Sequence, residues 1–332
     1  MILIGTDEAG YGPKLGPLVV TATVWRVKDR FQDSDFDHLT EGPRVDTRGG
    51  LRIVDSKALF QPRKKDSLSR LQAIVLAAWQ WFSEESHRQG DLAKEFSTLT
   101  LQSFLEVTAP QDLQRLLQRP WFAANLFASE INDLGDSSDC GVTRCRALIQ
   151  HWHSSSVRLL TVRQRILDAK FFNQCCRNLG NKASVLSEIT LALVAELLSE
   201  YRDEDALIYS DRHGGRAYYA GVLQHLLEAG NIEILCEDRQ TSRYRLQHLT
   251  RQVHWQFQVK GDTFAPVAMA SIFAKYTRER LMGCFNAFWC QAHQYPLRPT
   301  AGYPVDAARF LAEIEPARIE LGVTPDDLVR QR

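Results

Sequence analysis

Residues 4–13 read Ile-Gly-Thr-Asp-Glu-Ala-Gly-Tyr-Gly-Pro, an apolar strand that runs into two adjacent carboxylates and then into two glycines and a proline. Successive residues of a strand point to opposite faces, so Asp7 and Glu8 share a site only where the pleat breaks up, which Gly10 and Gly12 permit. Carboxylates at the end of a core strand are costly without a partner, and oxygen ligands suit Mg²⁺ or Mn²⁺. The stretch predicts a metal site, with a solvated turn as the alternative.

Composition limits the classes of protein to consider. The 332 residues allow one large domain or two. Lys plus Arg (40) equals Asp plus Glu (40), so nucleic-acid binding would need a local basic patch or bridging metal ions. Neither a long apolar run nor a basic-then-apolar N-terminus occurs, and we expect a cytoplasmic monomer without a membrane partner.

The seven cysteines are an odd number and predict reduced thiols rather than a disulfide framework. One cluster offers soft metal ligands: Cys140, Cys145, His151 and His153. Its spacing fits common zinc modules poorly. Zinc binding and ordinary buried thiols with surface histidines both stay open.

Strand and helix patterns alternate along much of the chain, which predicts an α/β fold. Strands are expected at 1–4, 18–27, 51–54, 157–166, 206–210, 232–236, 243–248 and 253–259. Helices are expected at 62–82, 184–201, 266–289 and 305–315. These patterns predict a discontinuous core, 1–89 and 156–290, a mostly helical insertion at 90–155, and a helical C-terminal part, 291–332, that carries Tyr303.

Three of the predicted strands run into an acid. The acids are Asp7 with Glu8, Asp211 and Asp262. When strands of one sheet end in carboxylates at the same edge, the acids converge and form a metal cage. Four such ligands can hold two divalent ions about 4 Å apart, which clamp the attacking and leaving oxygens of a phosphoryl displacement.

Several motifs, in this order, resemble those of the type 2 ribonucleases H. They are Asp-Glu-Ala-Gly-Tyr-Gly-Pro at 7–13, Gly-Pro-Leu-Val-Val at 16–20, Asp-Ser-Lys-Ala-Leu at 55–59, Lys-Gly-Asp at 260–262, Ala-Ser-Ile-Phe-Ala-Lys at 270–275 followed by Arg278 and Glu279, and Gly-Tyr at 302–303. The resemblance covers about residues 1–85 and 157–310.

The resemblance implies a ribonuclease H-like core with a mixed five-stranded sheet flanked by helices. It implies that Asp7, Glu8, Asp211 and Asp262 are catalytic metal ligands for Mg²⁺ or Mn²⁺, two ions in all. The implied substrate is RNA in an RNA/DNA hybrid, or ribonucleotides embedded in duplex DNA. The candidate substrate-binding residues are Gly10, Tyr11, Gly12, Lys57, Ser271, Lys275 and Tyr303.

Physical roles accompany these assignments. Ser271, Lys275 and Arg278 recur at helical spacing and form one polar stripe that could meet phosphates. Lys57 would pair with a carboxylate or a phosphate of the cleaved strand. In the family, the tyrosine at the position of Tyr303 packs on the sugar at the RNA–DNA junction, a task that suits a flat amphipathic ring.

Two positions depart from the family pattern. Tyr11 stands where the family usually has arginine, so charge assistance at the junction nucleotide is missing. Asp211 is followed by Arg212 and His213 instead of glycine. Arg212 would replace some of the lost charge, or His213 would lie near the leaving group as a proton donor.

The sequence therefore predicts a metal-dependent endonuclease that cuts the RNA strand of hybrids and leaves 3′-hydroxyl and 5′-phosphate ends. Two alternatives stay open. One is a nucleic-acid-binding protein that keeps the fold without cleaving, and the other is a related DNA junction nuclease.

Overall fold

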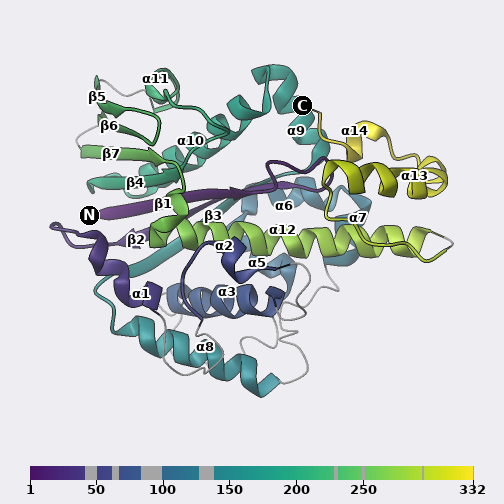
Figure 1. Cartoon of the computed structure of the whole chain (residues 1–332), viewed down its shortest axis with the longest axis horizontal. Coiled ribbons are helices and arrows are strands. Elements are labelled where there is room, and N and C mark those ends of the chain that lie inside the picture. The colour runs from purple at the N-terminus through teal and green to yellow at the C-terminus, as the bar shows by residue number, and fades with distance from the viewer. Residues whose placement is uncertain are drawn as a thin grey trace.

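The structure, a computed structural model, describes residues 1–41, 51–61, 67–83, 99–126, 138–227, 231–248, 251–293 and 295–331. A single seven-stranded sheet runs through it, in the order β3-β2-β1-β4-β7-β6-β5 (Figure 1). The strands are β1 (Ile2–Ala9), β2 (Leu18–Arg26), β3 (Arg158–Leu167), β4 (Ala206–Asp211), β5 (Asn231–Glu237), β6 (Thr241–His248) and β7 (Arg251–Gln258).

The sheet is mixed. β4 pairs in parallel with β1 and with β7, whereas the remaining neighbours are antiparallel. The predicted α/β fold with a mixed sheet flanked by helices is confirmed. The implied number of five strands is wrong, because β5 and β6 form a hairpin that pairs with β7 and extends the sheet.

Helices cover both faces of the sheet (Figure 1). On one face the long helix α12 (Ala265–Ala292) crosses β1 and β2, and α3 (Ser67–Ser83) and α7 (Pro120–Leu126) pack on it. On the other face α10 (Lys182–Glu200) packs over β2 and β3. Each face has its own buried apolar cluster, so the sheet separates two cores.

Shorter helices complete the fold. They are η1 (Asp33–Phe36), α1 (Asp37–Glu41), α2 (Ser56–Leu59), α5 (Leu101–Thr108), α6 (Pro110–Leu117), α8 (Ser138–His153), α9 (Ala169–Leu179), α11 (Ala220–Leu227), η2 (Gly261–Thr263), α13 (Pro304–Glu320) and α14 (Pro325–Leu328). In the part of the chain that the structure describes, no helix is long and apolar enough to cross a bilayer.

The predicted strand at 51–54 is wrong. These residues lie outside the sheet, and the Ile53 amide donates to the Leu39 carbonyl, 3.3 Å away. β1 already has β2 and β4 as neighbours and therefore offers no free edge to this segment. Its apolar residues Leu51 and Ile53 are buried in the core on the α12 side instead.

α12 begins close against β1. A Cβ atom built on Gly5 would lie 2.3 Å from the carbonyl carbon of Pro266, so only glycine at this position of β1 lets the helix come so near. This contact brings the first turns of α12, including Ser271, to the edge of the sheet at which β1 ends.

Candidate active site

The carboxyl ends of β1 and β4 place two of the predicted acids side by side. Thr6 is level with Ser210 in the parallel ladder, so the next residues, Asp7 and Asp211, lie at the same edge. Asp262 follows β7 in η2, and the neighbouring Gly261 amide donates to Oδ1 of Asp211 over 3.0 Å. The sequence-based inference that acids of three strands meet at one edge thus has a structural basis in the strand register.

The acids share an electrostatic environment. Burial, together with the charges of Asp211 and Asp262, raises the pKa of Asp7 to about 7, while hydrogen bonding by Ser271 opposes the shift. Burial also raises the pKa of Asp262, with Asp55 and Asp211 contributing and Lys57 opposing. These carboxylates therefore resist ionising together.

Glu8 lies in a regular strand, contrary to the expected break in the pleat. β1 continues to Ala9, and Glu8 pairs with Val20 of β2 directly after the Asp7 pair. Burial raises the pKa of Glu8 well above its usual range, and the charges of Asp7 and Asp211 act in the same direction. Glu8 therefore belongs to the electrostatic environment of the site even though the pleat is intact.

A pair of hydroxyl groups links the Asp-Ser-Lys motif to α12. Ser56 and Ser271 are buried, and their Oγ atoms lie 2.9 Å apart. The Asp55 carboxylate accepts from the Lys57 amide over 2.9 Å and thereby starts α2. Nζ of Lys57 lies 3.9 Å from Oδ2 of Asp262, and the Lys57 side chain is 82% exposed. The predicted pairing of Lys57 with a carboxylate is present.

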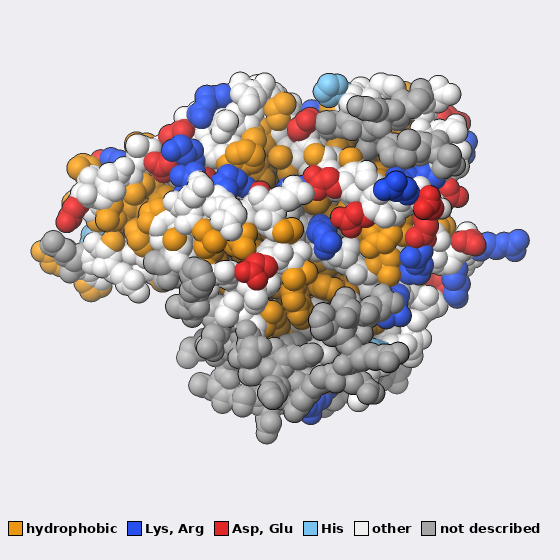
Figure 2. Space-filling model, turned by 180° about the vertical axis from the view of Figure 1, so that it is seen from behind, with side chains coloured by type: hydrophobic (Ala, Val, Ile, Leu, Met, Phe, Trp, Pro, Cys, Tyr) orange, Lys and Arg blue, Asp and Glu red, His pale blue; other side chains and the backbone are white. Residues whose placement is uncertain are grey.

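The acidic edge adjoins a cleft of about 770 Å³. Its polar lining includes Asp55, Lys57, Lys260 and Asp262. On the side of the molecule that Figure 2 shows, basic and acidic side chains are interspersed rather than gathered by sign. This distribution agrees with the zero net charge of the sequence.

The chemistry of the donor set fits a hard divalent cation, because the donors are carboxylate oxygens whose pKa values are raised by burial and, to a lesser extent, by one another's charge. Within the described ranges, however, no three acidic, His or Cys side chains come close enough together to hold an ion. The acids share an edge without forming a closed cage.

The structure brings Tyr303 together with the loop at residues 10–13, which is called the glycine loop below. The Lys14 amide donates to the Gly302 carbonyl over 2.7 Å, and a Cβ atom on Gly12 would lie 3.8 Å from Cε1 of Tyr303. Tyr303 is 55% exposed, so its ring is accessible beside the loop. Two motifs nearly 300 residues apart in the sequence thus form one surface next to the acidic edge.

The Tyr11 side chain packs against the start of α10. The Lys182 ammonium lies 4.5 Å from the centroid of the Tyr11 ring, and a Cβ atom on Gly214 would lie 2.4 Å from the Tyr11 hydroxyl. Gly214, at φ +57°, is thus needed both for its conformation and for room. Tyr11 packs the loop after β1 onto the loop after β4.

The predicted polar stripe on α12 faces protein rather than solvent. Lys275 donates to Glu279 over 2.8 Å and lies 4.5 Å from the centroid of the Phe60 ring. Arg278 is 2% exposed and donates to the Ala301 carbonyl over 3.0 Å. Together with Ser271, these side chains join α12 to the motifs around it, so direct phosphate contact by the stripe would need Lys275 to leave Glu279.

The residues after Asp211 have structural roles. Arg212 donates to the Arg239 carbonyl over 2.9 Å and to Ser242 over 3.1 Å, so its charge is directed to the β5–β6 turn. His213 is buried, with Nδ1 3.2 Å from the Ser187 hydroxyl, and burial lowers its pKa to about 3. At neutral pH His213 is therefore a neutral imidazole and not the imidazolium that a general acid would need, so the sequence-based suggestion of a proton donor to the leaving group is not supported.

The possible zinc ligands have other partners. Cys145 is buried and lies 3.4 Å from the Ala73 carbonyl, and burial raises its pKa to about 12. The His151 ring stacks on His38, with centroids 3.9 Å apart. The side chain of Cys140 lies outside the described part. Of the described members of this group, Cys145 thus behaves as a buried thiol and His151 as a paired histidine, and His153 is exposed.

Sequence reasoning missed Arg330. This buried arginine donates to the carbonyls of Gly10 and Pro13, 320 and 317 residues earlier in the chain. No motif surrounds it, and an arginine in a polar segment is by itself typical of an exposed side chain. Only the tertiary structure reveals its contact with the loop after β1.

Comparisons with known proteins add structural relatives only. No family model and no curated protein sequence matches the chain. Among solved structures it is similar to ribonuclease HII of Archaeoglobus fulgidus, in its complex with PCNA, at 14% identity and a TM-score of 0.40 over 100% of this chain and 95% of that one. It is also similar to ribonuclease H2 of Pyrococcus horikoshii, at 15% identity and a TM-score of 0.42 over 99% and 92% of the two chains.

A third similar structure is Bst-RNase HIII in complex with Mn²⁺, at 14% identity and a TM-score of 0.38 over 99% of this chain and 66% of that one. These three proteins are of the class that the sequence motifs resemble. Likeness at this level of identity and superposition leaves substrate and activity to be inferred from the residues themselves.

Proposed function

We propose that the protein is a divalent-metal-dependent endoribonuclease that hydrolyses the RNA strand of RNA/DNA hybrids, or ribonucleotides embedded in duplex DNA. The observation that carries the proposal is the meeting of Asp7, Asp211 and Asp262 at one sheet edge, with the two glycines and Tyr303 alongside. The motifs at these positions, which resemble those of type 2 ribonucleases H, name the substrate class.

Asp7, Glu8, Asp211 and Asp262 would hold Mg²⁺ or Mn²⁺. Bound there, two such ions would supply a nucleophile derived from water and stabilise the departing 3′-oxygen, giving 3′-hydroxyl and 5′-phosphate products. The Ser56–Ser271 contact joins α2 to α12, and Ser271 also hydrogen-bonds with Asp7, so these residues hold the two helices beside the acid. Lys57, largely exposed beside Asp262, is available to meet a phosphate of the cleaved strand.

The substrate-binding surface is the loop at 10–13 with Tyr303. The 2′-hydroxyl is the group by which a protein distinguishes RNA from DNA, and backbone amides can donate to it. An accessible tyrosine ring beside such amides can pack on the adjoining sugar. Because Tyr11 is engaged with Lys182 and Gly214, it contributes shape to the loop rather than charge.

A binding protein without cleavage is the second candidate, favoured by one observation. The described acids do not form a closed cage for an ion, and Lys57 already lies near Asp262. In that case the loop and Tyr303 would recognise the hybrid, while the acids would lack the arrangement needed for chemistry.

One assay separates the candidates. The purified protein is given three labelled strands, all DNA, all RNA, and DNA with one ribonucleotide, each paired to DNA, with Mg²⁺, Mn²⁺ or chelator. We expect cleavage only at ribonucleotides, and none with chelator. Hybrid binding without cleavage under every condition would select the binding protein, and cleavage of the all-DNA duplex would contradict the proposed substrate class.

A further inference from the structure

Arg330 is a buried cation that has no anionic partner among the residues the structure describes. Its side chain is 3% exposed, and its guanidinium lies 5.0 Å from the centroid of the Phe172 ring. Nη2 donates to the carbonyls of Gly10 and Pro13, whereas Nε and Nη1 have no hydrogen-bond partner among the described residues. Burying a guanidinium in this way is costly, so its place at the loop calls for a physical reason.

The two accepted hydrogen bonds determine how the loop's peptide groups point. In a trans peptide the C=O and the following N–H face opposite ways, so a Pro13 carbonyl turned toward Arg330 directs the Lys14 amide away from it. That amide indeed donates to the Gly302 carbonyl, over 2.7 Å. The same geometry at Gly10 directs the Tyr11 amide away from Arg330. Among the described residues, no acceptor is found for the Tyr11 or Gly12 amide.

A second arginine reinforces this arrangement. A Cβ atom on Gly10, whose φ is +94°, would lie 2.6 Å from Nε of Arg278. Arg278 is itself buried. Burial is the main cause that lowers the pKa of Arg330, and the positive charge of Arg278 lowers it further. Arg278 has Glu279 as a partner, with Nη1 3.3 Å from Oε1. The loop therefore lies on two guanidiniums, of which only one is neutralised by a described carboxylate.

The segment that carries Arg330 is firmly held. The Arg330 amide donates to the Lys14 carbonyl over 2.9 Å, and Val329 forms a β-bridge with Leu15. Buried Asn173 donates to the Val329 carbonyl over 2.8 Å and accepts from the Gln331 amide over 2.6 Å. This segment is therefore a fixed wall of the loop.

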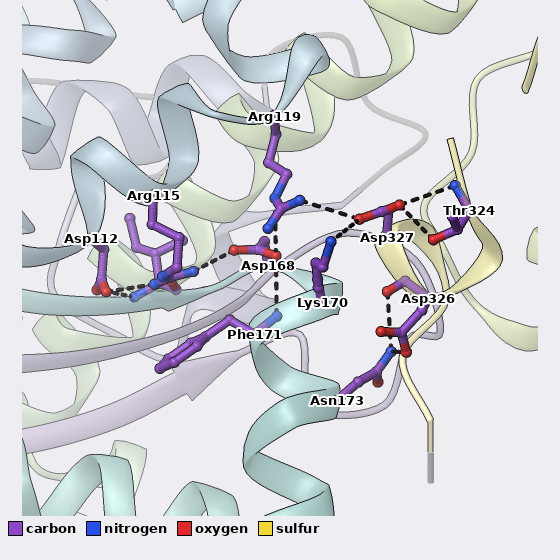
Figure 3. Close-up of polar contacts among 11 residues, drawn as sticks. Asp112, Arg115, Arg119, Asp168, Lys170, Phe171, Asn173, Thr324, Asp326 and Asp327 are labelled. Carbon is purple, nitrogen blue, oxygen red and sulfur yellow. Dashed lines mark hydrogen bonds and ion pairs between the residues drawn. The ribbon is translucent and has the colours of Figure 1, made fainter. Parts of the chain in front are cut away.

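Ion pairs hold the beginning of the same segment to α7 and α9 (Figure 3). Asp327 pairs with Arg119 over 3.3 Å and with Lys170 over 3.2 Å, and it accepts from Thr324. Because these contacts hold the backbone around Arg330, its side chain is already in position to donate to the loop carbonyls before a substrate binds.

We propose that Arg330 is a positioning residue for substrate binding: it holds the Gly10 and Pro13 carbonyls inward, so that the Tyr11 amide is turned outward and can donate to the ribose of the substrate, and it places positive charge behind the loop. This inference rests on the proposed function for the identity of the ligand. Tyr11 offers no charge at the loop, and Arg330 supplies it from behind, about 320 residues later in the chain.

The test compares Arg330→Met, Arg330→Lys and Arg245→Met. Arg245, on β6, pairs with exposed Glu233 on β5, so its replacement removes the same charge away from the loop. Hybrid binding is measured by fluorescence anisotropy with chelator, and KM and kcat are measured with Mg²⁺. For Arg330→Met we expect the Kd and the KM to rise roughly tenfold, since hydrogen bonds to a charged donor are lost, with kcat changed far less.

Arg330→Lys keeps the charge but cannot donate to both carbonyls as a planar fork does, so we expect an intermediate rise in Kd. It also serves if Arg330→Met does not fold. Should Arg330→Lys, or a folded Arg330→Met, bind and cleave like Arg245→Met, the inference is overturned.

Hydrogen exchange of the Lys14 and Leu15 amides provides a readout that needs no substrate. Both amides donate to the Gly302 carbonyl, and both should exchange faster in Arg330→Met if Arg330 orients the loop. If the wild-type protein neither binds nor cleaves hybrids, the proposed function fails. Faster exchange in the variant would then still support the hold on the loop, whereas unchanged exchange would refute it.

Discussion

The acidic edge and the glycine loop lie side by side but are built by different means. The acids are brought together by strand register: β1 and β4 pair in parallel, so Asp7 and Asp211 meet as soon as the ladder forms. The loop at 10–13 takes its shape from side chains and carbonyls elsewhere, chiefly Arg330 and Gly302. The proposed chemistry therefore depends on the pairing of β1 with β4. The proposed recognition depends on long-range contacts to the loop, which the replacement of a single side chain can remove.

The largest expected effect comes from the acidic edge. Asp211→Asn keeps an oxygen that can accept from the Gly261 amide, so the fold should persist while a metal-ligand charge is lost. We expect kcat to fall roughly 10²–10³-fold, the size seen when one electrostatic stabiliser of a transition state is removed. Single-turnover cleavage of a labelled hybrid with Mg²⁺ measures this.

Asp205→Asn is the matched control for that variant. Asp205 precedes the same strand at its opposite end and accepts from the Gln252 amide over 2.9 Å. Its replacement should leave kcat unchanged. Equal losses in the two variants would place the effect in the stability of β4 and not in metal binding.

The second-largest expected effect is a dependence of protein stability on pH, which should come from the acidic edge and not from the glycine loop. The pKa of Asp7 rises from 3.8 to about 7 on folding, so between pH 4 and 7 the folded state binds more protons than the unfolded chain. The metal-free protein should therefore lose stability as pH rises through this window, by up to about 4 kcal/mol from this group.

Urea unfolding with chelator at pH 5 and pH 7.5 measures this loss. Asp7→Asn should reduce the difference by the share of Asp7, with Glu8 and Asp262 supplying the rest, and Mg²⁺ should restore stability at the higher pH because a cation relieves the repulsion. Asp29→Asn, which alters a 96% exposed carboxylate, should not change the difference. A metal-free protein equally stable at both pH values would contradict the crowding of charge at the edge.

How much the sequence predicts follows from this contrast. Apolar runs that end in acids indicated β1, β4 and β7 and the meeting of Asp7, Asp211 and Asp262, because periodicity and strand ends are local properties. The segment at 51–54 has the same apolar character but lies outside the sheet, where β1 already has β2 and β4 as neighbours, and only the topology decides that. The β5–β6 hairpin was visible as two strands, yet its addition to the sheet was not.

The roles of single polar residues were less predictable. His213 and Arg212 follow Asp211 in sequence and suggested chemistry there, but His213 is buried against Tyr219 and Phe257, and Arg212 binds the β5–β6 turn. Arg330 showed the reverse, with no local signal and a direct contact to the loop. Residue type and spacing do not say where a long side chain ends.

Tyr303 offers a smaller test, on the recognition side. Tyr303→Phe keeps the ring beside Gly12 and removes its hydroxyl. We expect the ratio of cleavage at a single embedded ribonucleotide to cleavage of an all-RNA strand to change several-fold, about the effect of one hydrogen bond. The control is Tyr295→Phe, which alters another exposed tyrosine, 72% exposed. An unchanged ratio would end the assignment of the Tyr303 hydroxyl to the junction.

The smallest effect should come from Ser271, which lies where the edge meets α12. Ser271→Ala removes the hydrogen bonding that lowers the pKa of Asp7, so that pKa should rise and the acid limb of the pH–rate profile should move to higher pH. Loss of the buried contact with Ser56 should also cost about 1 kcal/mol of stability. Ser199→Ala, which breaks a bond to the Ala195 carbonyl on α10, is a control that should leave the profile in place. A profile that stays in place in Ser271→Ala while stability falls would make Ser271 a packing residue, and would leave the burial of Asp7 as the main cause of its raised pKa.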